Sequence, residues 1–432
     1  MRLFDSVVAT LGLSLPFQRF VREVLMLLLI IPGRATFLNL SRYSHYDEKT
    51  FRRWFRQEVN WAGLNVVAIR AVVPAHHDQV LAFDPSFVPK SGKQTPSLGR
   101  FWNGSAGRAE QGLEINVLAW VDVTANTAYA ISAALTPPEP ARVTPMATGT
   151  AAEATVQTSA KPTAKPTAKP TAKPTAKAED SRVDAYLAHL RRVIPEQSLS
   201  ALRYLTADGY FGKVKFVDGI QALEMELISK LRRDADLRYL YAGPYRGRGR
   251  PRLYDGKVDL ARRDRFTAVP SPDPDLILET AVVYAPRLRR RLRVVVVTHR
   301  HTRGMAVLFS TDLDLDPVTL YRYYAARFQI EFLFRDSKQF TGLTHCQARH
   351  AQALTFHVNA SLTAVSLTKL QTRQTLAHRP IPFSMASVVR RAFNEHFLQR
   401  LLAHLADGGR LAENSPEYET FCNYGLIQPI AA

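Results

Sequence analysis

A short repeat divides this chain and limits what either side of it can fold into. The unit Ala-Lys-Pro-Thr occurs four times in a row over residues 160–175, so a proline stands at every fourth position. Proline has no backbone N–H and interrupts helices and central strands, and the repeat offers no large apolar side chain to bury. We therefore predict an extended, disordered basic linker over residues 137–180, with folded regions before and after it.

Three consecutive strands are predicted before this linker. The stretches QVLAFDPSFVP (79–89), LEINVLAWVDV (113–123) and TAYAISAAL (127–135) are rich in β-branched and aromatic residues. Short connections between them favour an antiparallel meander. The first strand is expected to end at Asp84, which places a carboxylate at that edge of the sheet.

After the linker, the pattern changes to alternating helices and strands. Helix is predicted near 181–194 and 217–223, and strand in the segment reaching Asp208 and in 225–231. Residues 237–313 are predicted to be β-rich, and they contain the basic loop YRGRGRPRLYDGK. Further helices are expected from about residue 316, over 351–370 and over 385–405.

A polar stripe runs along the predicted helix YYAARFQIEFLFRDSK. Successive helical residues advance by about 100°, so its polar members fall on one side: Tyr324, Arg327, Glu331, Arg335 and Lys338. The rest of the helix is apolar nearly all round, which is typical of a buried helix. One interpretation is an intrahelical ion-pair ladder, because the charges are spaced at i,i+4. The other is a functional site, because buried charges need partners such as metals or phosphates.

The composition points to a polyanionic partner. The 432 residues carry 57 Lys and Arg against 38 Asp and Glu, a net charge of +19, which favours nucleic acid or an anionic membrane surface. The apolar run over residues 24–31 is too short to span a bilayer and is predicted to be a buried helix. The two cysteines, Cys346 and Cys422, lie far apart without metal-ligand spacing, which fits a reducing cytoplasm.

A second basic stripe lies near the N-terminus. From a predicted cap at Ser44 or Asp47, four cations fall on one helical face: Lys49, Arg52, Arg53 and Arg56. Aromatic residues occupy the opposite face. This arrangement is what the recognition helix of a helix-turn-helix domain needs, although a solvated basic surface on a small helical bundle would look the same.

Three carboxylates stand in an order that has chemical meaning. Asp84 follows the first strand, Asp208 the fourth, and Glu331 lies on the late helix, which is the order of an RNase H-like core. Two Mg²⁺ ions need hard carboxylate oxygens that leave positions open for water and phosphate. The predicted fold is therefore an α/β fold: an RNase H-like mixed sheet flanked by helices, with a β-rich insertion before the glutamate helix.

Here the chain resembles the DDE transposases of bacterial insertion sequences, in the group with a Y-x2-R-x3-E-x6-K signature. Tyr324, Arg327, Glu331 and Lys338 match that spacing, and the blocks around Asp84 and Asp208 also look similar. The resemblance spans roughly residues 20–400. The repeat-bearing linker departs from the usual pattern.

The resemblance implies a function and a set of site residues. Asp84, Asp208 and Glu331 would be the catalytic metal ligands, holding two Mg²⁺ ions, with Mn²⁺ as a substitute. DNA-backbone contacts are expected from Tyr324, Arg327, Lys338, Arg246, Arg248, Arg250 and Arg252, in addition to the N-terminal Lys49, Arg52, Arg53 and Arg56. The family mechanism implies binding of double-stranded terminal inverted repeats, cleavage through a hairpin and strand transfer, performed by a homodimer in the cytoplasm.

The expected organisation follows from these elements. It comprises a helical DNA-binding domain (1–70), the core (71–136 and 181–236), the linker (137–180), the β-rich insertion (237–313), the glutamate helix (314–375) and a C-terminal helical region (376–432). Two other functions fit the same residues: a catalytically inactive or domesticated DNA-binding protein, and another RNase H-like nuclease. The presence of all three carboxylates favours the transposase.

Overall fold

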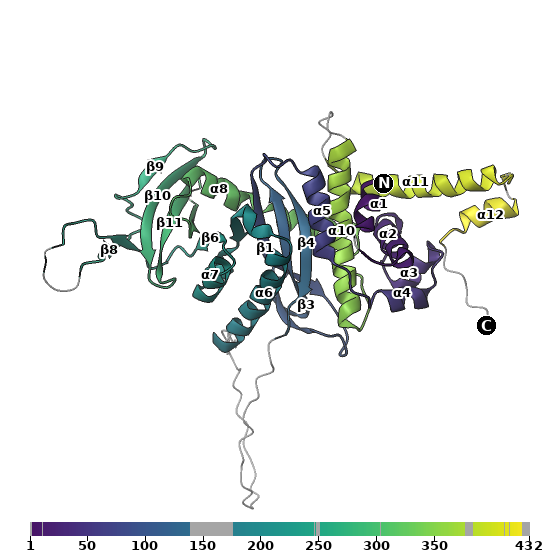
Figure 1. Cartoon of the computed structure of the whole chain (residues 1–432), viewed down its shortest axis with the longest axis horizontal. Coiled ribbons are helices and arrows are strands. Elements are labelled where there is room, and N and C mark those ends of the chain that lie inside the picture. The colour runs from purple at the N-terminus through teal and green to yellow at the C-terminus, as the bar shows by residue number, and fades with distance from the viewer. Residues whose placement is uncertain are drawn as a thin grey trace, which may run out of the picture.

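One long sheet runs through the molecule, with helices gathered beyond its β4 end and others packed on its faces (Figure 1). The computed structural model describes residues 2–10, 12–138, 176–245, 247, 251–302, 304–375, 383–409, 411–413 and 415–425. The repeat of the predicted linker lies outside the described residues. Helix α6 begins at Ala176, so the last five positions of the predicted linker are helical instead.

Five strands form the core of the sheet in the order β4-β3-β1-β5-β6. They are β1 (Gln79–Pro89), β3 (Arg108–Asp122), β4 (Thr127–Leu135), β5 (Tyr204–Ala207) and β6 (Glu226–Leu231). Strand β3 pairs antiparallel with β1 and β4, whereas β5 pairs parallel with β1 and β6. A meander followed by parallel strands in this order is the RNase H-like arrangement, which confirms the predicted fold class.

Strand β1 continues past the expected end at Asp84. Its pairing with β3 runs on from Asp84 opposite Val117 to Pro89 opposite Gly112. A side chain at Gly112 would collide with the ring of Phe87, 2.5 Å from its Cβ position. Glycine therefore permits the pairing to extend, and Asp84 lies within the strand. The sequence patterns also missed β2 (Gly99–Asn103), a short partner of β3.

The core sheet is covered on both faces. Helices α6 (Ala176–Glu196) and α7 (Val214–Gln221) lie over one face. There an aromatic cluster of Phe83, Phe211 and Phe216 is fully buried. On the other face, α9 (Gln329–Phe340) packs across β4, β3 and β1. This places α9 directly over the strand that carries Asp84.

The free edge of β4 is closed by polar side chains. Helix α10 (Ala351–Thr375) lies beside this strand together with α5 (Trp61–Val72). The Asn359 side chain accepts from the backbone N–H of Ala133 at 2.8 Å, and the Ser366 hydroxyl accepts from that of Ala130 at 2.8 Å. Unpaired strand edges are prone to association, so these contacts satisfy groups that would otherwise be open.

The β-rich insertion extends the core sheet. Its strands are β7 (Arg238–Leu240), β8 (Tyr254–Lys257), β9 (Thr267–Val269), β10 (Leu276–Ala285), β11 (Arg290–His299) and β12 (Met305–Ser310). Strand β12 pairs antiparallel with β6, so twelve strands form one sheet. Helix α8 (Pro317–Ala326) packs on β11 and β12, and its Leu320 joins a small separate core with Val295 and Leu308.

Four helices precede α5: α1 (Arg2–Ala9), α2 (Leu15–Ile30), α3 (Phe37–Arg42) and α4 (Glu48–Trp54). The predicted cap at Asp47 is confirmed, because its side chain accepts from the backbone N–H of Thr50 at 2.7 Å. The predicted long basic helix is wrong. Helix α4 ends at Trp54, so Arg56 lies beyond it. The buried run in residues 24–31 lies at the end of α2, as expected, and packs against α10.

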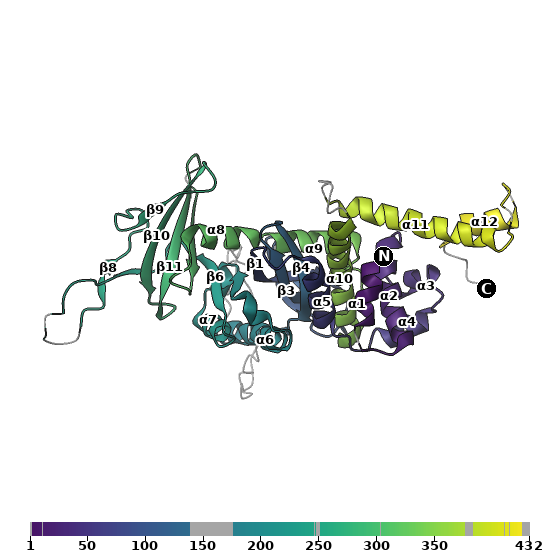
Figure 2. The ribbon, with the colours of Figure 1, turned by 45° about the horizontal axis from the view of Figure 1, so that its top comes forward.

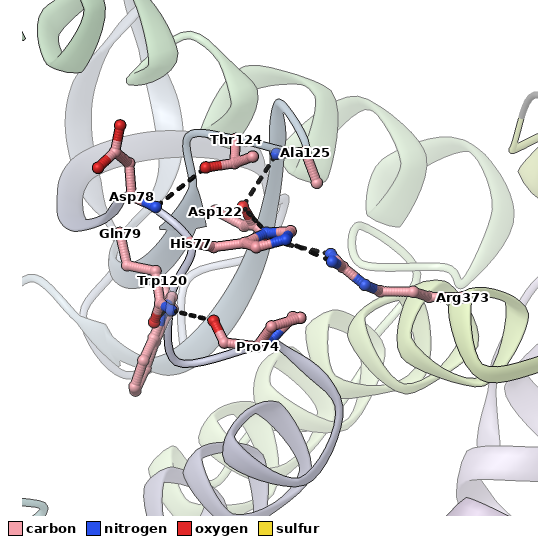
Figure 3. A network of polar contacts seen from close by, with 9 residues as sticks. All are labelled: Pro74, His77, Asp78, Gln79, Trp120, Asp122, Thr124, Ala125 and Arg373. Atoms are coloured by element: carbon pink, nitrogen blue, oxygen red, sulfur yellow. Dashed lines mark hydrogen bonds and ion pairs between the residues drawn. The ribbon is translucent and has the colours of Figure 1, made fainter. Parts of the chain in front are cut away.

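A polar network joins the end of α10 to the sheet (Figure 3). Asp122 ends β3 and is fully buried. Its carboxylate accepts from the Arg373 guanidinium at 2.7 Å and lies 2.9 Å from Nδ1 of His77. The backbone N–H of Ala125 donates to the same carboxylate at 2.9 Å. These contacts compensate the buried charge and tie α10 to the turn between β3 and β4.

Two helices form the C-terminal part, α11 (Met385–Ala406) and α12 (Pro416–Cys422). Helix α11 begins beside α2 and extends away from the rest of the molecule (Figure 2). The helices expected over 351–370 and 385–405 are thereby confirmed as α10 and α11. None of the described helices combines the length and the apolar character needed to cross a membrane.

Candidate active site

Asp84 lies on the face of β1 that α9 covers. The neighbours Phe83 and Phe87 belong to the alternate positions of the strand, and Phe83 packs into the aromatic cluster on the opposite face. The side chain of Asp84 is 16% exposed. Strand alternation therefore puts the carboxylate toward the helix with the polar stripe.

Asp208 directly follows β5, which pairs in parallel with β1. Its side chain accepts from the backbone N–H of Tyr210 at 2.9 Å and caps a short 3₁₀ helix, Gly209–Phe211. Its carbonyl oxygen accepts from the Ser229 hydroxyl at 2.6 Å. The adjacent strand β6 thus helps to orient the carboxylate.

The helix with the stripe is broken into two. Helix α8 ends at Ala326, and α9 begins at Gln329 after Arg327 and Phe328. The expectation of a single, almost wholly buried helix is wrong. Phe328 is 48% exposed, while Ile330 and Leu333 face the core. Helix α9 is therefore amphipathic, because one side packs on the sheet and the other meets solvent.

Arg327 stands between two of the three carboxylates. Its Nη1 lies 3.6 Å from Oδ2 of Asp84, and its Nη2 lies 3.3 Å from Oε1 of Glu331. The guanidinium is also 5.7 Å from the ring centroid of Tyr324. Burial opposes the charge on Arg327, but Asp84, Tyr324 and Glu331 keep the pKa of this residue above its usual range. The break after α8 thus places one cation among several acidic groups.

The ion-pair ladder forms only in part. Arg327 pairs with Glu331, but Arg335 pairs with Asp336 at 2.9 Å and lies over the Phe332 ring at 4.7 Å. Asp336 is almost fully buried, and Arg335 pairs with it instead of with Glu331. The side chain of Glu331 is 44% exposed and is therefore accessible from solvent.

The carboxylates of the candidate site influence one another electrostatically. The pKa of Asp84 is raised to about 7, chiefly by burial; the charge of Arg327 opposes the rise, and those of Asp208 and Glu331 add to it. Burial also raises the pKa of Asp208, while the Tyr210 N–H and Arg327 lower it. Like charges disfavour each other's ionisation at short range. The charges of Asp208 and Glu331 therefore act on Asp84, and Arg327 lies within ion-pair distance of Asp84 and Glu331.

This group of oxygens suits a hard divalent cation. Carboxylates are the ligands that Mg²⁺ and Mn²⁺ prefer, and a cation would offset the burial and the carboxylate repulsion that together raise the pKa of Asp84. In the described residues, no three His, Cys, Asp or Glu side chains yet converge as a metal-binding cluster. Arg327 occupies the space between Asp84 and Glu331 instead.

The other residues of the predicted signature lie on the same helices. Tyr324 is largely buried, and burial raises its pKa. Lys338 is half-buried near the end of α9, and burial lowers its pKa. In the described part of the chain, no carboxylate forms an ion pair with the ammonium group of Lys338.

Of the four insertion arginines expected to contact DNA, only Arg252 belongs to the described residues. Arg246, Arg248 and Arg250 lie outside the described residues. Arg252 pairs with Asp255 at 2.7 Å and lies over the Tyr241 ring at 5.0 Å. In the N-terminal group, Arg52 pairs with Glu48, while Lys49, Arg53 and Arg56 are exposed.

Two residues near Asp208 were not anticipated. Ser229 anchors the carbonyl of Asp208, and the ammonium of Lys230 helps to lower the pKa of Asp208. Both lie on β6. The strand itself was predicted, but only the parallel pairing of β5 with β6 brings these side chains next to the carboxylate. No local motif in the sequence marks them.

Comparisons with known proteins bear on the same region. The sequence model of the family described as DDE superfamily endonuclease matches residues 14–292. The match includes Asp84 and Asp208 and ends before Tyr324. No curated protein matches the chain.

One similar solved structure is a piggyBac transposase synaptic complex with hairpin DNA. The identity is 11% and the TM-score 0.37, and the similarity covers 82% of this chain and 58% of that chain. The family match covers more than half of the sequence, and the sheet has the RNase H-like strand order. The chain therefore belongs to the DDE superfamily endonucleases.

Proposed function

We propose that this protein is the DNA transposase of an insertion sequence. In this proposal it binds the terminal inverted repeats and cuts them in a metal-dependent reaction. The freed 3′-OH then forms a terminal hairpin, which is opened before strand transfer into target DNA. The observation that carries the proposal is the position of Arg327 between Asp84 and Glu331, with Asp208 near enough for its charge to act on both Asp84 and Arg327.

The three carboxylates are the proposed metal ligands. Asp84 and Asp208 come from adjacent parallel strands, and Glu331 comes from the helix that packs across β1. Two Mg²⁺ ions, for which Mn²⁺ would substitute, would activate the attacking oxygen and stabilise the leaving oxygen. Rigid strands suit this role, because catalytic ligands must hold their positions closely.

The neighbouring side chains would bind and orient the DNA backbone. Arg327 is positioned to neutralise negative charge at the carboxylates and to hold Glu331 through its 3.3 Å contact. Tyr324 and Lys338 would bind phosphates on either side of the reacting one. No nucleophilic side chain is required, since water or a DNA hydroxyl attacks the phosphorus directly. The protein contributes positioning and charge neutralisation.

The partner in this proposal is double-stranded DNA, both transposon ends and target. The net charge of +19 supports a polyanionic partner. We further propose that two copies of the chain join two DNA ends as a homodimer. The arginines of the insertion, Arg252 among them, would contact the backbone of the hairpin end.

The test is cleavage of a labelled duplex that carries the element's own terminal repeat. Wild type is compared with Glu331→Gln in Mg²⁺, in Mn²⁺ and with EDTA. A nick followed by a hairpin, both requiring metal and Glu331, is the expected result. We expect Glu331→Gln to lower the rate by at least about a thousandfold, since removing a metal ligand disables the reaction.

The same assay separates the competing functions. Tight, salt-sensitive binding without a cut in any divalent metal would indicate a DNA-binding protein that has lost catalysis. A nick without a hairpin would indicate another RNase H-like nuclease. Exposed Glu395, which pairs with Arg391 on α11, provides the matched control, and Glu395→Gln should cleave as wild type does.

A further inference from the structure

A basic groove lies between the N-terminal helices and the core. Its cavity volume is about 1250 Å³. One wall comes from α3, α4 and the residues after α4, and the other from the loop after β1 and the loop between α9 and α10. Six lysines or arginines line it, with Glu48 as the acidic member of the lining: Arg34, Arg52, Arg56, Lys90, Lys93 and Arg349.

Most of these cations are not neutralised by the protein. Arg52 pairs with Glu48, and Lys90 donates to the carbonyl oxygen of Cys346. In the described part of the chain, no ion pair engages the other four: Arg34, Arg56, Lys93 and Arg349 are all exposed. Like charges repel one another, so a groove with this lining is stabilised by an anionic occupant.

The two walls are held in a defined relation. The backbone N–H of Ala35 donates to Nδ1 of His345 at 3.2 Å, which joins the N-terminal segment to the α9–α10 loop. Between them, Gly342 has φ +67°, and a Cβ there would lie 2.8 Å from the Cβ of Ala35. Glycine allows both the backbone conformation and the close approach. The groove is therefore built by tertiary contacts between distant segments.

Size and shape select the class of ligand. The volume exceeds the roughly 300–1,000 Å³ of small-molecule pockets. Binding to an anionic membrane requires a protruding surface that combines cations with apolar residues. The cations of this groove line a concave site instead. A polyanion with regularly spaced charges, such as a nucleic acid backbone, matches cations on two opposing walls.

The groove continues from the elements that carry the candidate catalytic residues. Lys90 directly follows β1 and is six residues beyond Asp84, which is at most about 20 Å of extended chain. From Glu331 the rest of α9 rises about 14 Å before the loop that lines the groove. Phosphates along one DNA strand are about 3.4 Å apart. A duplex held at the carboxylates would thus reach the groove about five phosphates away.

We propose that this groove binds the phosphate backbone of double-stranded DNA, next to but separate from the three carboxylates. The choice of DNA rests on the function proposed above. The inference assigns Arg34, Lys93 and Arg349 to DNA binding together with Arg52 and Arg56. It also gives α4 a different role from a recognition helix. The side of α4 that bears Arg52 faces the groove, so α4 contacts the backbone rather than reading bases.

The test measures DNA binding by the full chain in EDTA, so that cleavage does not interfere. A labelled random-sequence duplex is titrated at several NaCl concentrations with wild type and with Lys93→Gln/Arg349→Gln. We expect the double variant to bind about tenfold more weakly. The slope of log K against log salt should fall by about two, because each lost phosphate contact contributes about 0.9.

The matched control removes the same charge elsewhere. Arg191 on α6 and Arg391 on α11 are exposed and lie away from the groove lining. Arg191→Gln/Arg391→Gln should bind within about twofold of wild type, with an unchanged slope. Equal Tm values for all variants would exclude unfolding as the cause of weaker binding.

The outcomes distinguish this inference from the proposed function. If the groove variant and the control bind duplex equally well, the groove is not a DNA site, whatever the cleavage assay gives. Binding to anionic vesicles but not to duplex would also overturn the inference. If wild type binds no duplex, both proposals fail. A groove-specific loss of binding in a protein that never cuts DNA would support the groove and reject the transposase.

Discussion

The ionisation of Asp84 depends strongly on the surroundings of this residue. Burial raises its pKa to about 7, so the folded protein binds a proton there more tightly than the unfolded chain, in which the pKa is near 4. The associated stabilisation is fully present below about pH 4. It is lost as the pH rises through about 7, because the folded state then has to carry an unfavourable charge.

Replacing Asp84 with Asn should remove this pH dependence. In EDTA, the free energy of unfolding of wild type is expected to fall between pH 4 and pH 8, by up to about 4 kcal/mol for a shift of roughly three pKa units. Asp84→Asn should flatten that fall and be the more stable protein at pH 8. Urea unfolding at a series of pH values measures the free energy of unfolding of both proteins. Exposed Asp78, which pairs with Arg322, supplies the control Asp78→Asn.

Parallel pH profiles for wild type and Asp84→Asn would show that Asp84 ionises normally. Addition of Mg²⁺ at pH 8 is expected to stabilise wild type and to have less effect on Asp84→Asn, since the metal would offset the repulsion among the carboxylates.

At the scale of elements, α10 supports the site along its length and through its C-terminal end. It closes the edge of β4 with Asn359 and Ser366, and its C-terminal Arg373 reaches the buried carboxylate of Asp122 (Figure 3). Helix α9 packs against α10 as well as on the sheet. The position of Glu331 therefore depends on how firmly α10 is held.

Removing the positive partner of Asp122 should loosen this attachment. Arg373→Ala leaves a fully buried carboxylate without its guanidinium, which typically costs about 3 kcal/mol. Urea denaturation measures the loss. The control Arg391→Ala breaks an exposed pair with Glu395 and should cost less than about 1 kcal/mol. Equal losses for the two variants would contradict a structural role for the network.

At the scale of the whole molecule, one sheet connects the RNase H-like core to the strands β7–β12. Strand β12 pairs with β6, and its Phe309 is fully buried in the main core. A continuous sheet with a shared core favours joint unfolding of the two parts. The insertion therefore acts as an extension of the core, with the candidate site on the adjoining strands.

Phe309→Ala should destabilise the core and the insertion together. The cavity is expected to cost about 3–5 kcal/mol. Hydrogen exchange should show lower protection in β1 as well as in β10 and β11. Exposed Phe328 provides a control of the same chemistry, because Phe328→Ala removes little buried surface. Loss of protection confined to β10–β12 would mean that the insertion unfolds independently.

Much of this organisation could be predicted from the sequence, because its patterns report local physics. Runs rich in β-branched and aromatic residues predicted β1 and β4, and the order of strands, helices and carboxylates indicated the RNase H-like core. The cap at Asp47 was also predictable, since it depends on a side chain and a backbone group three residues apart.

Other features depend on contacts between distant segments. Buried Asp336 pairs with Arg335, and the helix breaks after Ala326. The intrahelical ion-pair ladder considered from the sequence is therefore incomplete. Pairing with β3 extends β1 beyond Asp84, and pairing with β5 brings β6 next to Asp208.

The sequence by itself thus determined the elements, their order and the types of residue available for chemistry. Only the tertiary structure decided which charges meet. It surrounded Arg327 with acidic groups, and it made a basic groove from segments that are hundreds of residues apart. The physical reason is that propensity and periodicity act over a few residues, whereas electrostatic and packing energies depend on distance in space.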